Sequence, residues 1–269
     1  MRAALAWRWL AYAVCASVGV YLIAPMAIVV LISFSSSALL TFPPPGFSLR
    51  WYQNLVNTPA WRDSFAVSVQ VMLMTSVLAT VLGTMAAVAL WGRRSLLMGV
   101  SRGVLMAPLI VPHIVSGAAM YLLLDAWGWV GTLQALVVAH TVLAVPFVLV
   151  SVSSALETCD RSLAQAALTL GATPFQAFRR ITLPLIWPGI LSGFLFAAVL
   201  SFDELIVSLF LSTPRTRTVT VQMWNNVFAD IDPAITAIAS LLLLVSMVLL
   251  TAHAWVGRRR AGTAVVTPL

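Results

Sequence analysis

Apolar residues run through this chain in long stretches with no regular polar alternation. Each stretch has about 20 residues or more, the length that a helix needs to cross the hydrocarbon core of a bilayer. Because backbone groups cannot stay unpaired in lipid, such stretches favour helices. The pattern predicts an all-α polytopic membrane protein with six transmembrane helices in one domain, residues 1–269. The expected spans are residues 9–32, 64–90, 104–124, 133–152, 187–211 and 233–256.

Polar or helix-breaking residues mark three places in this pattern. Residues 49–56 lie between the first two spans and are expected to form a short amphipathic helix or a plain Trp/Tyr anchor. Pro108 and Pro112 expose backbone carbonyls in the third span, so a kink is expected there, facing the bundle interior. The fifth span is interrupted at residues 201–204, which read Ser-Phe-Asp-Glu.

The connector between the fourth and fifth spans, residues 153–186, predicts two short helices joined at Gly171. Gly171 suits the left-handed position that ends the first helix, and Thr173 suits the N-cap of the second, with Pro174 as its first residue. Pro184 and Pro188 are expected to close the second helix. The N-cap of the first helix is either Asp160 or Ser162, the latter in a capping box with Gln165.

Arginine distribution predicts the orientation of the spans. The chain has no lysine, and its basic residues are fifteen arginines. Eleven fall at the termini and in the loops after the second and fourth spans, whereas four fall on the opposite side. Short loops rich in arginine stay in the cytosol. Both termini and the Gly171 connector are therefore expected to be cytosolic.

The same connector carries a motif that resembles the loop motif of binding-protein-dependent ABC importer permeases. That motif reads E-A-A, three residues, G, nine residues, I, one residue, L-P. It is matched here, with Gln in place of the usual Glu, by Gln165, Ala166, Ala167, Gly171, Ile181, Leu183 and Pro184. The resemblance implies a type I ABC importer permease fold and a coupling helix that docks on a separate ATPase. The alternative is a connector whose helices only lie on the membrane surface.

The resemblance also implies the setting of the chain. It implies a bacterial inner membrane protein that works with a dimer of ABC ATPase subunits, a second permease that is expected to be a distinct paralogue, and a periplasmic substrate-binding protein. ATP and Mg²⁺ would be bound by the ATPase, so no cofactor is expected in this chain.

Composition and missing residue types exclude several other functions. With 61% hydrophobic and 9% charged residues, the chain is not an ordinary soluble domain. Without lysine it has neither a P-loop lysine nor a Schiff-base nucleophile. The arginine excess is loop charge on a membrane protein, so no nucleic-acid partner is expected. His113, His140 and His253 have no second ligand at metal spacing, so we predict no metal site, no catalytic set and no enzyme.

Asp203 and Glu204 are the candidate residues of a substrate path, together with His113. Asp203 lies fifteen residues beyond Pro188, about 22 Å along a helix and therefore within the membrane. A carboxylate at such a depth costs about 2.5–3.5 kcal/mol and should face a cavity or a partner. We expect one of the pair to line the path and the other to pack against a neighbour or cap a broken helix. A structural pair with Arg215 or a subunit arginine is the alternative, as is a satisfied interior histidine for His113.

Residues 201–204, 210–212 and 218–224 resemble the second permease of spermidine/putrescine-type importers. This resemblance implies transport of a small, cationic or amine-bearing solute, although family members also carry opines, aminobutyrate, phosphonates or ferric iron. A stand-alone secondary transporter or channel is the alternative function. It would need an internal inverted repeat, which residues 1–130 and 131–269 do not display.

Overall fold

The structure is a computed structural model that describes residues 2–92, 95–229 and 233–263, and helices make up most of them. In this part of the chain no strand forms, only a single bridge between Ser35 and Phe47. The all-α prediction is confirmed. Five helices among the described residues are long and apolar enough to cross a membrane: Trp7–Ser33, Pro59–Leu90, Leu133–Glu157, Pro174–Asp203 and Ala234–Ala254.

The chain divides into two compact units, and the first comprises Met1–Arg62 with Gln222–Leu244. It contains α1 (Arg2–Ser33) and the short helix α2 (Arg50–Asn57), which agrees with the helix expected at residues 49–56. The hydroxyls of Tyr52 and Ser33 are 2.8 Å apart, and the indole N–H of Trp51 donates to the carbonyl of Ser35. These two bonds fix α2 against the end of α1.

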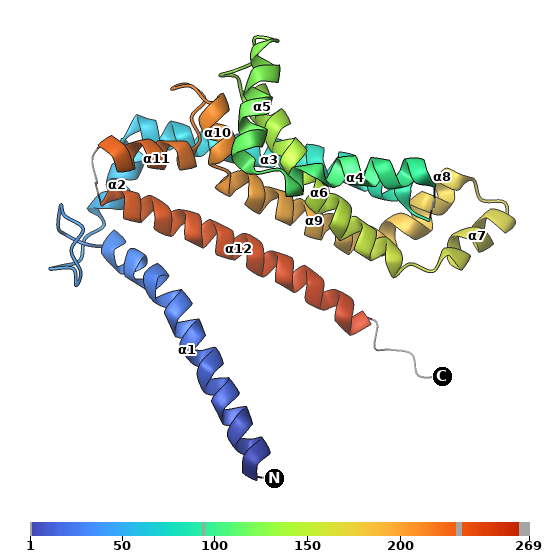
Figure 1. Cartoon of the computed structure of the whole chain (residues 1–269), viewed down its shortest axis with the longest axis horizontal. Helices are drawn as coiled ribbons and strands as arrows, with labels where there is room; N and C mark the ends of the chain where they lie inside the picture. The colour runs from blue at the N-terminus through green and yellow to red at the C-terminus, as the bar shows by residue number, and fades with distance from the viewer. Residues whose placement is uncertain (1, 93–94, 230–232, 264–269) are drawn as a thin grey trace. The chain divides into compact units, whose positions relative to one another are not determined.

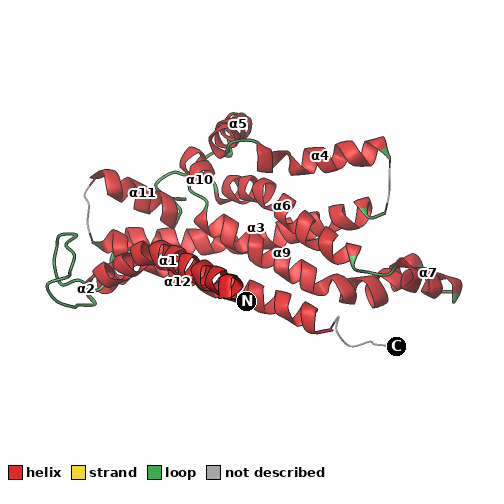
Figure 2. Ribbon diagram, turned by 60° about the horizontal axis from the view of Figure 1, so that its bottom comes forward, coloured by secondary structure: helices red, strands yellow, loops and turns green. Residues whose placement is uncertain are grey.

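The second unit comprises Asp63–Val221 with Val245–Leu269, and α6 (Leu133–Glu157) lies at its centre. Figure 2 shows α6 between α4 (Leu96–Ile110) and α9 (Leu183–Asp203). A Cβ on Gly83 of α3 (Pro59–Leu90) would lie 2.7 Å from the Val148 side chain, and one on Gly193 of α9 would lie 3.1 Å from the Val148 Cα. Small residues therefore let α3 and α9 both approach α6 closely at Val148.

The third predicted span is sharply broken. It forms α4 and α5 (His113–Asp125), which are bent by 108° to each other, and Figure 1 shows α5 at a steep angle to α4. Val111 and Pro112 between them have extended backbone. Pro112 disfavours the helical conformation of Val111 and cannot donate a backbone hydrogen bond, so the helix ends there. Pro108 lies inside α4 without ending it.

The expected end of the second connector helix at Pro184 and Pro188 is wrong. One continuous helical stretch, Pro174–Asp203, passes through both prolines. It consists of α8 (Pro174–Ala177), the π-helical turn η1 (Phe178–Thr182) and α9, in which Pro188 is interior. The wider turn of η1 ends at Thr182, two residues before Pro184, where an α-helical turn would bring the proline ring against the carbonyl four residues earlier. The helix that carries the fifth predicted span therefore starts before residue 187. It is interrupted after Asp203, where the sequence predicted a break, and a short helix, Ile206–Leu211, follows.

Candidate functional site

The Gly171 segment, residues 160–184, lies beyond the last residue of α6 (Figure 1). Its first helix is α7 (Arg161–Thr169), which is capped by Asp160: the carboxylate accepts a 2.8 Å hydrogen bond from the backbone N–H of Ser162. This bond, together with one from the Ser162 side chain, holds the pKa of Asp160 below its usual value. Of the two caps that the sequence allowed, the structure has Asp160.

Gly171 ends α7 in a left-handed conformation, with φ of +91°. Its N–H donates to the carbonyl of Leu168, and the N–H of Ala172 donates to the carbonyl of Ala167, both at 3.0 Å. This pair of bonds is the Schellman motif, in which a glycine relieves the strain of a positive φ. The sequence prediction for this position agrees with the geometry.

Thr173 then begins α8 with a full capping box. Its hydroxyl accepts from the backbone N–H of Gln176, and the Gln176 side chain accepts from the backbone N–H of Thr173 at 2.9 Å. Pro174 takes the first helical position as expected. The hydrogen bonds of both caps are made within the segment itself, between residues 167 and 176.

The motif residues divide by position within this segment. Gln165 and Ala166 are exposed on α7, Ala167, Ile181 and Leu183 are partly buried, and Pro184 is exposed on α9. Large apolar side chains around them are exposed as well: Leu163, Leu168, Leu170 and Phe175. Leu170 is 88% exposed. Exposed apolar surface of this kind is typical of sites that contact another protein or a membrane.

A polar site separate from the Gly171 segment forms where α9 ends and α10 (Ile206–Leu211) begins. Glu204 occupies the break in extended conformation and is 6% exposed. One carboxylate oxygen accepts from the backbone N–H of Val207 at 2.9 Å, and the other lies 3.2 Å from His113 Nδ1 of α5. Its backbone carbonyl accepts from the hydroxyls of Ser208 and Thr220. The structure thus brings His113 and Glu204 together.

Asp203, the last residue of α9, differs from its neighbour. Its side chain is exposed and makes no hydrogen bond or ion pair with the described residues. Arg215 pairs with neither carboxylate in the part of the chain that the structure describes. Adjacent residues on a helix point about 100° apart, so the two carboxylates have separate surroundings.

His140 completes this polar site, although the sequence did not single it out. It is 1% exposed in the middle of α6. Its Nδ1 lies 2.9 Å from the Ser201 hydroxyl of α9, and its Nε2 lies 2.9 Å from the Ser208 hydroxyl of α10. The imidazole therefore joins the two helices across the break. Partners 61 and 68 residues away leave no local spacing signal in the sequence.

Among the described residues no group of three or more His, Cys, Asp or Glu side chains could hold a metal ion. Of the other histidines, His253 of α12 (Ala234–Thr263) lies 3.1 Å from the Ser192 hydroxyl of α9 and packs edge-on against Phe196. It therefore has a structural contact within the second unit.

Two groups of known proteins resemble this chain in sequence. The putrescine transport system permease protein PotI of Escherichia coli K12 is 37% identical over 231 residues, covering 83% of this chain and 82% of PotI. The spermidine/putrescine transport system permease protein PotC of the same strain is 29% identical over 238 residues, covering 88% of this chain and 90% of PotC.

Solved structures share the fold at lower identity. A chain of a bacterial ABC transporter involved in the import of alginate matches with a TM-score of 0.77 and 13% identity, covering 94% of this chain and 96% of that one. A chain of the MetNI methionine ABC transporter matches with a TM-score of 0.62 and 20% identity, covering 79% and 99%. The model of the family described as "Binding-protein-dependent transport system inner membrane component" matches residues 79–262. The chain therefore belongs to this family and is the permease component of an ABC importer, whose ATP is hydrolysed by a separate ATPase.

Proposed function

We propose that this permease forms half of the path for a small polyamine-like cation. Asp203 is the observation that carries the proposal: it is a carboxylate at a helix break within the predicted span, with no partner among the described residues. Burying such a charge costs about 2.5–3.5 kcal/mol on the mildest scale. A protonated amine passing along the path would offset that cost. The relatives named for putrescine and spermidine transport support the same chemistry.

Glu204 has a different role in this proposal. Its carboxylate already accepts from Val207 N–H and contacts His113, so it holds α10 in place beside the path. Asp203 is the substrate-facing residue, and Glu204 and His113 are positioning residues. The path is completed by a second permease, which we expect to be a distinct paralogue.

The Gly171 segment is the proposed contact with the ATPase. Both termini and this segment face the cytosol, where a dimer of ATPase subunits binds ATP and Mg²⁺, and a periplasmic binding protein delivers the solute on the other side. The exposed apolar side chains of α7 and α8 support this assignment. ATP-driven closure of the ATPase dimer would move α7 and α8 and reorient the helices of the bundle.

ATP-dependent uptake by the reconstituted importer tests the proposal. Putrescine, spermidine, an opine, aminobutyrate, a phosphonate and ferric iron are compared as substrates. We expect the two amines to be transported, with Asp203→Asn abolishing uptake while assembly and basal ATP hydrolysis persist. Asp160→Asn is the matched control, because it removes a carboxylate outside the spans and keeps a capping side chain. Amine uptake unchanged by Asp203→Asn, or transport of the anions alone, would contradict the proposal.

A further inference from the structure

A pocket of about 370 Å³ lies in the second unit where α3, α4, α6 and α7 come together. Its apolar wall includes Ala87, Leu90 and Leu156, and its polar groups include Arg102, Glu157 and Arg161. It is separate from the break at Glu204 and from the motif residues of the Gly171 segment. The apolar helices α3 and α6 end beside it, at Leu90 and Glu157.

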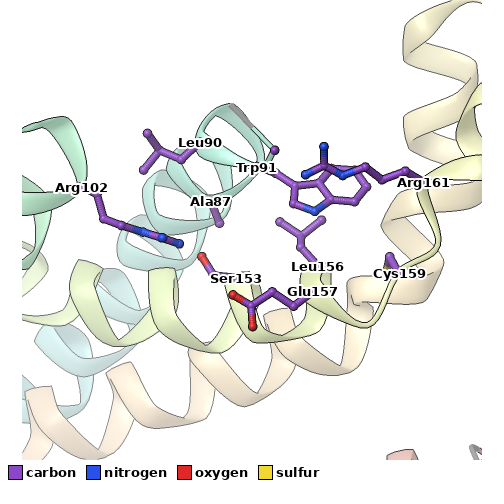
Figure 3. A pocket seen from close by; sticks show the side chains of 10 residues that line it. Ala87, Leu90, Trp91, Arg102, Ser153, Leu156, Glu157, Cys159 and Arg161 are labelled. Atoms are coloured by element: carbon purple, nitrogen blue, oxygen red, sulfur yellow. The ribbon is translucent and has the colours of Figure 1, made fainter. Parts of the chain in front are cut away.

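Two arginines extend toward this pocket from opposite sides (Figure 3). Arg102 comes from α4, and Arg161 is the first residue of α7. Neither forms an ion pair with Glu157 or with any other described residue, although Glu157 lines the same pocket. Two guanidinium groups and a carboxylate therefore share one pocket, and the carboxylate forms no ion pair with either guanidinium group.

The Arg161 guanidinium is held in a defined position. It lies over the Trp91 ring, 4.8 Å from the ring centroid, where a cation–π interaction stabilises it. It also packs against Gly92, where an added Cβ would collide with it. Gly92 has φ of +70°, a conformation that favours glycine. The backbone at residue 92 thus makes room for this guanidinium beside the pocket.

The donor set fits a phosphate diester. Guanidinium groups bind phosphate oxygens through paired N–H donors, and two of them can hold one phosphate. Glu157 brings the net charge of the three side chains to +1, which matches the single negative charge of a diester better than the charge of free phosphate. The Glu157 carboxylate can also accept a hydrogen bond from a hydroxyl or ammonium at the far end of a headgroup.

The position of the pocket favours a lipid as the source of this phosphate. Spans end where lipid headgroups lie, and tryptophan is enriched at that depth. Basic pockets between helices on the cytoplasmic side bind anionic headgroups. We propose that the pocket lined by Arg102, Glu157 and Arg161 binds the phosphodiester headgroup of a membrane phospholipid, so that a lipid links the end of α3 to the start of α7.

Lipid retention by the assembled importer tests this proposal. The complex with its partner subunits is equilibrated with phosphatidylglycerol or phosphatidylethanolamine in a phosphatidylcholine background, and retained lipid is counted by native mass spectrometry. We expect retention to fall at least tenfold in Arg102→Gln, which alters an exposed side chain. Gly92→Ala should lower it as well, because it displaces the Arg161 guanidinium without removing a charge.

Arg50→Gln is the matched control, since Arg50 also stacks on a tryptophan, 4.3 Å from the Trp51 ring centroid, but does not line this pocket. We expect its lipid retention to be that of the wild type. Equal losses in Arg50→Gln and Arg102→Gln would show only general attraction of lipid to basic residues and would overturn the proposal. Displacement of the lipid by equimolar inorganic phosphate would likewise overturn it in favour of a free-anion site.

Discussion

Substitutions of Gly171 test the effect of its backbone conformation alone, because a Cβ at this position would not clash with the rest of the chain. The residue has φ of +91° and closes α7 through the Schellman bonds of Leu168 and Ala167. A Cβ added at this position would meet no atom within 4 Å. Any effect of a substitution inside the isolated chain must therefore come from the backbone conformation and not from a clash.

The expected cost follows from that conformation. An L-residue in the left-handed region loses about 1–2 kcal/mol relative to its preferred backbone. For Gly171→Val this shifts the local equilibrium between the formed and the open helix end by about 5–30-fold. Asparagine tolerates this region better than other residues, so Gly171→Asn should lose less. The expected order of damage is valine, then alanine, then asparagine.

Hydrogen exchange and ATPase association measure the effect. In Gly171→Val we expect faster exchange of the amides of α7 and α8, weaker co-purification of the ATPase and loss of uptake, with the chain still inserted in the membrane. Gly99→Val is the control, because Gly99 of α4 also has open space around its Cβ but no positive φ. If valine and asparagine at position 171 behave alike, the conformational argument fails.

Three further substitutions test individual contacts. Glu204→Gln should lower stability by about 1.5–3 kcal/mol, the range for hydrogen bonds to a charged group, and a double-mutant cycle with His113→Gln in thermal unfolding should give a non-additive coupling. Purely additive losses would contradict the pairing. Gln165→Glu should leave uptake unchanged, because residue 165 is exposed and Asp160 already caps α7; a large loss would show that the ATPase contact rejects a negative charge. Since the folded-state pKa of Asp160 is lowered, its cap should be intact above pH of about 4 and lost as the pH falls through the lowered pKa, whereas Asp160→Asn should keep α7 protected from exchange at acidic pH.

Local rules were sufficient for the ends of helices. Gly171, Thr173 and Pro174 each lie where the residue type predicts, because the conformation of a cap depends on a few neighbouring backbone groups. The presence of several long apolar helices could also be predicted, because span length depends on bilayer thickness. The capping box that Gln176 completes with Thr173 also follows a local rule, although the sequence analysis named only the Thr173 cap.

The helix interruptions show where such rules stop. Pro112 ends a helix whereas Pro184 and Pro188 do not, although all three lack the same hydrogen-bond donor. The difference is that η1 precedes Pro184 and widens the helix, and that Ile186 and Ile190 bury their side chains in the core on the same helix. Tertiary packing of this kind offsets the lost bond, and no pattern within the window of a single helix reports it.

The break between α9 and α10 also depends on contacts distant in sequence, because its backbone groups need hydrogen-bond partners. Interrupting a helix inside a membrane leaves backbone groups that lipid cannot satisfy. Here Glu204 supplies an acceptor to Val207, and its own carbonyl takes the hydroxyls of Ser208 and Thr220. His140 joins Ser201 and Ser208 from the neighbouring α6. These polar groups are paired with one another. Asp203 has no partner among the described residues, so its carboxylate is available to a charge from outside the chain. The sequence could place two acids in a span, but the proposed division into a positioning residue and a substrate-facing residue rests on contacts from α5, α6 and α10, which the sequence does not report.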